Sequence, residues 1–309
     1  MKWLFLGVLV LAAVVLALWT PDMSASELDE RYAKPSLKVI EVDGLNIHYQ
    51  DTGPKGAPVL LLLHGFGSSL QTWDEWAAQL EKHYRVIRLD LPGFGLTGPS
   101  PVNDYSEEKD VATLTHFVDK LGIDELSVIG HSMGGKMAWT FAADQGPRVK
   151  ALVLMAPDGY PQAEAIGTKP YAMPAVMGLM KFFLPKYLVR KSLEPAFFDA
   201  TALDDRLVER YYDMLRAPGV RGAILERGQQ TIYTDPVPRL KKITAPTLLL
   251  WGQDDLMIPS SNAQSYAGVL ADAQTVLLPN LGHLLQEEQS QLGLAQVTQF
   301  LNPKLQLVK

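Results

Sequence analysis

The residue with the clearest chemical potential is Ser132, which lies in the pattern G-x-S-x-G between Gly130 and Gly134. A serine on a sharp turn between a strand and a helix has strained backbone angles, and side chains two positions away would collide with the turn. Glycine at positions 130 and 134 removes that collision. The turn would expose the serine hydroxyl and direct the first amides of the next helix at a molecule bound beside it.

A pattern of five residues occurs by chance in many chains, so the flanking sequence decides how it is interpreted. Residues 128–129 are typical of the buried end of a strand, and residues 136–145 of a helix rich in Ala, Met, Trp and Phe. Strand, turn and helix therefore follow one another in the order that a nucleophilic serine requires.

Hydrolysis through Ser132 requires a base, because a serine hydroxyl is almost never ionised at neutral pH. Among the six histidines, His283 follows the last predicted strand in Leu281-Gly282-His283. A loop at that point ends at the edge of the sheet that carries the turn, so we expect His283 to be the base. The other histidines are interpreted as structural, solvated or, for the neighbour of Ser132, directed elsewhere: His48, His64, His83, His116 and His131.

The imidazole in turn needs a carboxylate that holds its tautomer and stabilises the imidazolium. Asp254 and Asp255 both follow the apolar run 247–250. Only one of them need be the partner of His283. The other is explained equally well as a turn residue or a helix cap.

Continuous aliphatic runs alternate with helical patterns along most of the chain, which predicts a mostly parallel sheet between helices in an α/β fold. Before them, two short runs around Asp43-Gly44 predict a hairpin. The predicted strands are residues 37–42, 45–50, 59–63, 85–89, 126–129, 151–155, 247–250 and 275–278, and the helical patterns include 71–81 and 106–121.

Residues 158–240 interrupt this alternation, because they carry no buried-strand pattern and are rich in Met, Phe, Tyr and Pro. We expect a helical cap inserted over the carboxyl ends of the strands, where ligands of open sheets bind. Plain packing is the alternative interpretation of these apolar side chains. The predicted core then has two parts, residues 37–157 and 241–309.

Residues 3–19 contain no charged residue, follow Lys2 and have a tryptophan at each end. As a helix they would reach about 25 Å, slightly less than the thickness of a bilayer core, and the tryptophans would suit its two interfaces. Residues 1–22 are therefore predicted to be a membrane anchor, or a cleaved signal peptide as the alternative, with residues 23–36 as a linker. The predicted location is the outer, periplasmic side of the membrane, or secretion if the segment is cleaved.

Composition limits the partners. The net charge of −6 argues against a nucleic-acid partner. The chain has no cysteine, which excludes a disulfide framework, a thiol nucleophile and a Cys-ligated zinc. No His/Asp/Glu cluster suggests a metal, so no cofactor is expected. The oligomeric state is not predicted.

Residues 37–301 resemble an α/β-hydrolase-fold serine hydrolase, a group that includes bacterial esterases, lipases and carbon–carbon bond hydrolases. The order nucleophile, acid, histidine in that family is matched by Ser132, Asp255 and His283. The form G-x-x-D from Gly252 onward favours Asp255 over Asp254. A serine nucleophile separates the chain from haloalkane dehalogenases and related epoxide hydrolases, which use a carboxylate.

Two further segments are similar to segments of that family. His64-Gly65-Phe66-Gly67 is similar to the family's oxyanion loop, which implies the backbone amides of Phe66 and Met133 as the donors to the oxyanion. Residues 90–95 match a segment that is mainly architectural.

The resemblance implies two-step acyl transfer without a metal or organic cofactor. We expect a small-molecule substrate that is an ester with an apolar acyl or alcohol part. A carbon–carbon bond hydrolase acting on ring-cleavage diketones is the alternative, and it would use the same three residues. A ligand receptor with little turnover is an alternative of another class.

Overall fold

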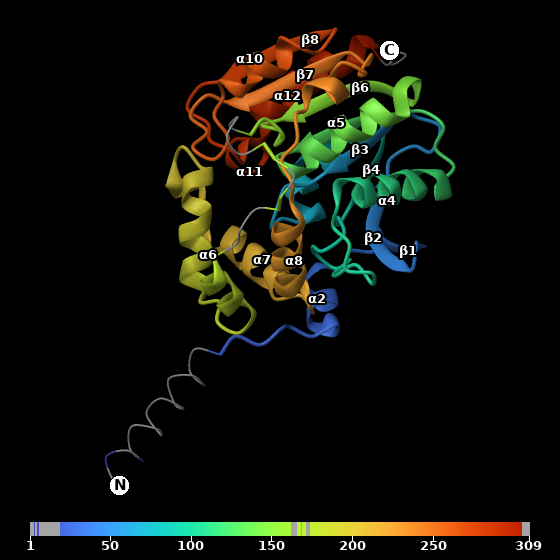
Figure 1. Cartoon of the computed structure of the whole chain (residues 1–309). Helices are drawn as coiled ribbons and strands as arrows, with labels where there is room; N and C mark the ends of the chain where they lie inside the picture. The colour runs from blue at the N-terminus through green and yellow to red at the C-terminus, as the bar shows by residue number, and fades with distance from the viewer. Residues whose placement is uncertain are drawn as a thin grey trace.

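The computed structural model describes residues 19–161, 166–167, 169–170 and 174–304, together with residues 3 and 5. Within this part of the chain, one sheet of eight strands has the order β1-β2-β4-β3-β5-β6-β7-β8 (Figure 1). It is parallel from β4 to β8, whereas β1 and β2 are antiparallel to their neighbours. The strands are β1 (Leu37–Val42), β2 (Leu45–Thr52), β3 (Val59–Leu63), β4 (Arg85–Leu89), β5 (Leu126–His131), β6 (Val149–Met155), β7 (Thr247–Gly252) and β8 (Ala273–Leu278).

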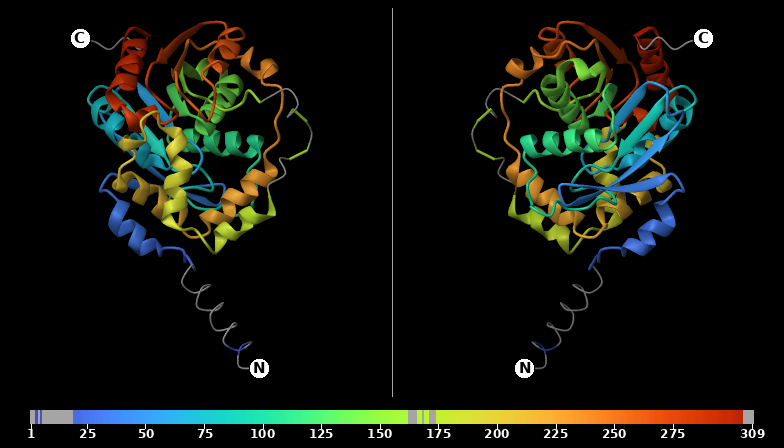
Figure 2. Two further views of the ribbon diagram at one scale, coloured as in Figure 1. Left: turned by 90° about the vertical axis from the view of Figure 1, so that its left-hand side faces the viewer. Right: turned by 90° about the vertical axis from the view of Figure 1, so that its right-hand side faces the viewer.

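Helices cover both faces of the sheet (Figure 2). On one face lie α4 (Glu107–Lys120), α5 (Met133–Gln145) and α10 (Asn262–Ala267), and on the other α3 (Asp74–Leu80), α11 (Leu285–Glu288) and α12 (Ser290–Lys304). The remaining α-helices of the described residues are α2 (Ala25–Tyr32), α6 (Lys186–Leu193), α7 (Asp205–Leu215), α8 (Val220–Gln230) and α9 (Val237–Leu240). Short 3₁₀ helices are η1 (Leu70–Trp73), η2 (Gly146–Arg148), η4 (Ala175–Lys181), η5 (Glu194–Ala196) and η6 (Ala200–Ala202).

The side chains on the two faces of the sheet pack into two separate hydrophobic cores. In β3, Leu61 and Leu63 pack with the α4–α5 face, whereas Leu60 and Leu62 pack with the α3–α12 face. All four side chains are fully buried. Successive side chains of a strand point to opposite faces, so an uninterrupted aliphatic run is what a strand covered on both sides needs. The prediction of a mostly parallel sheet between helices is confirmed.

The predicted elements differ from the observed ones mainly at their ends. Helix α5 begins at Met133 instead of residue 136, because Gly134 and Gly135 are weak helix formers on their own and are held in the helix by packing. The predicted helix 71–81 is divided into η1 and α3.

The described part of residues 158–240 is helical and contains no strand, as expected for an inserted cap. Its boundaries stay a prediction. Part of the predicted linker 23–36 is ordered as α2, and Figure 2 places α2 beside the cap helices. Asp213 of α7 accepts hydrogen bonds from Arg31 at 2.8 Å and from the hydroxyl of Tyr32 at 2.9 Å. The segment before β1 is therefore tied to the cap.

The predicted membrane anchor and the location derived from it need correction. No helix among the described residues is long and apolar enough to cross a bilayer. Most of the apolar stretch 3–19 lies outside the described residues, with only Trp3, Phe5 and Trp19 inside them. The prediction of a membrane-anchored or secreted protein is contradicted, and the hydropathy of residues 1–22 alone does not sustain it.

Candidate active site

The turn at Ser132 has the strained geometry that its sequence predicts. Ser132 lies between β5 and α5 with φ 54° and ψ −121°, a backbone conformation that costs energy for any residue with a Cβ. Its amide donates to the carbonyl oxygen of Met155 at 2.9 Å, which ties the turn to β6.

The two flanking glycines allow the turn to pack against its surroundings. A Cβ at Gly134 would lie 2.4 Å from the carbonyl oxygens of Leu63 and His64. A Cβ at Gly130 would lie 2.3 Å from the carbonyl oxygen of Gly134 and 2.7 Å from Ala138. The expected collision is therefore present in the geometry, and α5 starts in contact with the end of β3.

The structure brings Asp255 and His283 together from separate loops. Asp255 follows β7 and His283 follows β8, and Asp255 Oδ2 lies 2.7 Å from His283 Nδ1. Both residues are buried. The second oxygen of Asp255 accepts the amides of Met257 at 2.8 Å and Ile258 at 2.9 Å, so the carboxylate is held in one orientation.

Asp254 takes the role that was expected of the aspartate not paired with His283. Its Oδ2 accepts the amide of Asn280 at 2.9 Å, and Asn280 has a positive φ of 56°. Asp254 thus stabilises the turn after β8 and leaves His283 to Asp255.

Ser132, His283, Phe66 and Met133 line one cavity of about 790 Å³. Its other walls come from the start of α4, the first turns of α5, and residues 227–239 of the predicted cap. The described part of the Met- and aromatic-rich stretch, residues 174–198, contributes no lining residue. The apolar side chains that we expected this stretch to contribute are therefore absent from the described lining of the cavity. Apolar side chains that do line it include Met137, Ile232, Met257 and Ile258.

An oxyanion donor must be an amide that has no hydrogen-bond acceptor within the protein, and this requirement applies to the amides of Phe66 and Met133. Met133 is the first residue of α5, where an amide has no acceptor within the helix. Both residues line the cavity, and neither amide is occupied by an acceptor among the described residues.

His64 anchors the loop that carries Phe66. The amide of Leu91 donates to His64 Nε2 at 3.0 Å, so the proton lies on Nδ1, which donates to the carbonyl oxygen of Gly65 at 2.8 Å. Burial lowers the pKa of His64 to about 4. The sequence interpretation explained this loop by its glycines and missed the histidine that fixes it.

Asp90 fixes the neighbouring segment in a similar way. Its two oxygens accept the amides of Leu70 at 2.7 Å and Leu96 at 2.8 Å. Burial raises the pKa of Asp90 to about 7. These contacts are consistent with the architectural role that the resemblance implied for residues 90–95.

His131 is the residue whose function the sequence did not reveal. Its Nε2 lies 3.0 Å from the carbonyl oxygen of His283, and because a carbonyl only accepts, Nε2 carries the proton. The two imidazole rings lie 4.6 Å apart. Burial, together with the nearby His283, holds the pKa of His131 well below its usual value. His131 therefore positions the backbone of His283 as a neutral ring.

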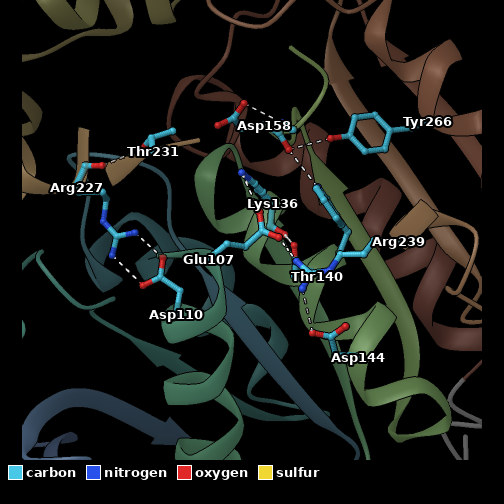
Figure 3. Close-up of polar contacts among 12 residues, drawn as sticks. Glu107, Asp110, Lys136, Thr140, Asp144, Asp158, Arg227, Thr231, Arg239 and Tyr266 are labelled. Carbon is cyan, nitrogen blue, oxygen red and sulfur yellow. Dashed lines mark hydrogen bonds and ion pairs between the residues drawn. The ribbon is translucent and has the colours of Figure 1, made fainter. Parts of the chain in front are cut away.

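The basic side chains of the cavity wall are all paired with acids in the described part of the chain (Figure 3). Lys136 Nζ lies 2.9 Å from Glu107, which also contacts Arg239. Arg227 forms a bidentate ion pair with Asp110, and both side chains are buried. No group of His, Asp and Glu residues within the described ranges could hold a metal ion.

The chain belongs to the alpha/beta hydrolase fold family, whose model matches residues 58–290. It is 28% identical over 289 residues to a 2-hydroxy-6-oxononadienedioate/2-hydroxy-6-oxononatrienedioate hydrolase of Paraburkholderia xenovorans, covering 90% of this chain and 98% of the relative. The predicted fold class is confirmed, and so is the prediction of a hydrolase.

Two solved structures extend the similarity. The structure of a membrane phospholipase A described as a bacterial virulence factor has a TM-score of 0.73 and 26% identity, covering 98% of this chain and 99% of that one. A meta-cleavage product hydrolase from Pseudomonas fluorescens has a TM-score of 0.73 and 27% identity, covering 86% and 97%.

The close packing at Gly134 leads to a first prediction. Gly134→Ala should destabilise the fold by about 2 kcal/mol or more, because the new methyl group meets two backbone oxygens that cannot move aside. Gly56→Ala is the matched control, since its Cβ would meet no atom within 4 Å. Urea denaturation measures both variants, and equal stability of the two would contradict the packing described for the turn.

The neutral, buried state of His64 leads to a second prediction. The pKa of His64 is about 4 in the fold and near 6.5 in an unfolded chain. The unfolded state therefore binds the proton more readily between these values. The stability that neutral His64 supplies is fully present above about pH 6.5 and is lost as the pH falls toward 4.

Glutamine at position 64 cannot take up this proton, so the destabilisation caused by His64→Gln should shrink by up to about 3 kcal/mol between pH 7.5 and pH 4. Other titrating groups, including Asp90, are present in both proteins and cancel from the difference. Denaturation curves at the two pH values measure it. A difference that stays constant with pH would show that His64 is not held neutral by burial.

Proposed function

We propose that the protein is a serine hydrolase that cleaves carboxylic esters of uncharged, largely apolar substrates through an acyl-enzyme on Ser132. The observation that supports this most strongly is that Ser132 and His283 line the same cavity, with His283 hydrogen-bonded to Asp255 at 2.7 Å. Nucleophile, base and orienting acid are then present together, as acyl transfer requires.

The proposed mechanism assigns one role to each group. Asp255 accepts a hydrogen bond from the Nδ1–H of His283, which holds the tautomer with Nε2 as the basic nitrogen. His283 removes the proton of Ser132 as its oxygen attacks the carbonyl carbon. The amides of Phe66 and Met133 stabilise the oxyanion, and His283 then protonates the leaving alcohol.

Water completes the cycle on the acyl-enzyme. His283 removes a proton from water, the resulting nucleophile attacks the acyl carbon, and the second oxyanion is held by the same two amides. When the carbonyl re-forms, the Ser132 oxygen leaves and takes back the proton from His283. The products are a carboxylic acid and an alcohol, and the residues return to their starting state.

A second candidate is hydrolysis of a carbon–carbon bond in ring-cleavage diketones by the same residues. The name of the Paraburkholderia relative and the meta-cleavage product hydrolase support this candidate, and on sequence similarity they favour it over ester cleavage. The ester candidate is supported by the phospholipase structure, which covers 98% of the chain. It is also supported by a cavity wall whose described cations are all paired, since the relatives' named substrates are carboxylates.

A substrate panel separates the candidates. The panel contains p-nitrophenyl esters of increasing acyl length and 2-hydroxy-6-oxo-6-phenylhexa-2,4-dienoate, the substrate named for another relative. The ester proposal predicts larger kcat/KM for the esters. Turnover confined to the dienoate would replace it with the carbon–carbon candidate, and turnover of neither would indicate a ligand receptor.

Ser132→Ala tests the site itself in the same panel. Activity on the preferred substrate should fall on the order of 10⁴-fold or more, because no other group supplies the nucleophile. An unchanged thermal midpoint shows that the variant is folded. Full activity of this variant would contradict the assignment of Ser132.

A further inference from the structure

We propose that Glu107 determines which substrate charge the cavity accepts, by neutralising Lys136 and Arg239 on the wall of the cavity that Ser132 lines. The wild-type protein then favours an uncharged substrate over the same substrate with a carboxylate on its acyl chain. This inference rests on the proposed function, because it places the acyl chain in the cavity beside Ser132.

Lys136 is the first of the two cations. It lies one helical turn beyond the nucleophile, with its amide donating to the carbonyl oxygen of Ser132 at 3.0 Å. Its Nζ lies 2.9 Å from Glu107 Oε2, and the two side chains are only 16% and 21% exposed. A pair so far removed from solvent is weakly screened by water and salt, so the neutralisation persists in solution.

Arg239 is the second cation and comes from a distant part of the chain. It belongs to α9, whereas Glu107 is the first residue of α4 and Lys136 belongs to α5. Arg239 contacts Glu107 Oε1, the oxygen that Lys136 does not use, and lies 3.8 Å from Asp144. Figure 3 shows Glu107 between the two basic side chains. The single carboxylate of Glu107 thus forms an ion pair with both cations.

The rest of the described cavity wall contains no lysine or arginine without an acidic partner that could bind a substrate carboxylate. Arg227 is held by both oxygens of Asp110, and its guanidinium also donates to the carbonyl oxygen of Pro92. The described lining contains five carboxylates and only three lysine or arginine side chains: Glu107, Glu108, Asp110, Asp158 and Asp235, against Lys136, Arg227 and Arg239. A carboxylate on the substrate would meet a surplus of negative charge, whereas an uncharged chain would not.

The same ion pairs could serve only to fasten α9 to α4 and α5. A purely structural fastening affects every substrate alike, because it changes the position or stability of the wall and not its charge. A charge filter changes the ratio between a charged and an uncharged substrate. The ratio is therefore the quantity that separates the two roles.

The experiment compares wild type with Glu107→Gln and Glu108→Gln on p-nitrophenyl butyrate and the p-nitrophenyl monoester of glutaric acid. These esters differ by the terminal carboxylate of the acyl chain. Glu108→Gln is the matched control, because Glu108 is the next residue, lines the same cavity and has no ion pair in the described structure. Both variants lose one negative charge, but only Glu107→Gln removes the acid that pairs with Lys136 and the nearer of the two acids beside Arg239.

We expect the ratio of kcat/KM for the glutarate monoester to that for the butyrate ester to rise about tenfold or more in Glu107→Gln, as one charge-assisted hydrogen bond would give. In Glu108→Gln the ratio should rise less than about threefold. Equal ratios in the two variants, or equal loss on both esters in Glu107→Gln, would overturn the proposal.

Binding of adipate by calorimetry gives a readout that does not need turnover. Adipate should bind Glu107→Gln at least tenfold more tightly than it binds wild type or Glu108→Gln. Absence of ester hydrolysis would count against the proposed function alone, while equal adipate affinity of the three proteins would overturn the role of Glu107.

Lys136→Gln keeps the inference testable if Glu107→Gln does not fold. Removing this cation leaves the carboxylates in greater excess, so the kcat/KM ratio should fall below that of wild type and adipate should bind more weakly. A ratio that rises in Lys136→Gln would contradict the proposed charge filter.

Discussion

The close approach of α5 to the end of β3 is the constraint on which the rest of the site depends. Any side chain at Gly134 would meet the carbonyl oxygens of Leu63 and His64, so the first turn of α5 can lie this close to β3 only with glycine at this position. Ser132, two residues before this contact, has a positive φ, and a residue strained in this way persists only when its surroundings over-determine it. The serine hydroxyl and the amide of Met133 are placed at the cavity as a consequence.

The parallel order of the sheet supplies the other half of the site. Strands β5, β6, β7 and β8 are consecutive neighbours, so the loops that follow them emerge at one edge. Asp255 and His283 meet there, although 28 residues separate them in sequence. His131, next to Ser132, donates to the backbone of His283 and links the strand that carries the serine to the loop that carries the imidazole.

Much of this arrangement could be predicted because it depends on local patterns. The aliphatic runs locate the strands to within a few residues, since a strand covered on both faces is a nearly continuous run of hydrophobic residues. The order of Ser132, Asp255 and His283 is also visible in the sequence. The start of α5 and the existence of α2 were missed, because packing and capping contacts override weak helical signals there.

The rest depends on contacts between distant residues, which leave no local pattern. Glu107 meets Arg239 only because the chain folds α9 back over α4 and α5, and nothing near either residue in sequence indicates the pair. The hydrogen bonds of His64 and His131 are of the same kind. The location was predicted from hydropathy at the N-terminus alone and is corrected above, where no helix among the described residues is long and apolar enough to cross a bilayer.

The central claim is that His283, oriented by Asp255, makes the hydroxyl of Ser132 reactive. The most direct measurement is the rate at which an uncharged alkyl fluorophosphonate modifies the protein, with the adduct located by peptide mass spectrometry. The account predicts a single adduct on Ser132 that forms at least about a hundredfold more slowly in His283→Gln. An adduct on another residue, or an unchanged rate in that variant, would contradict it.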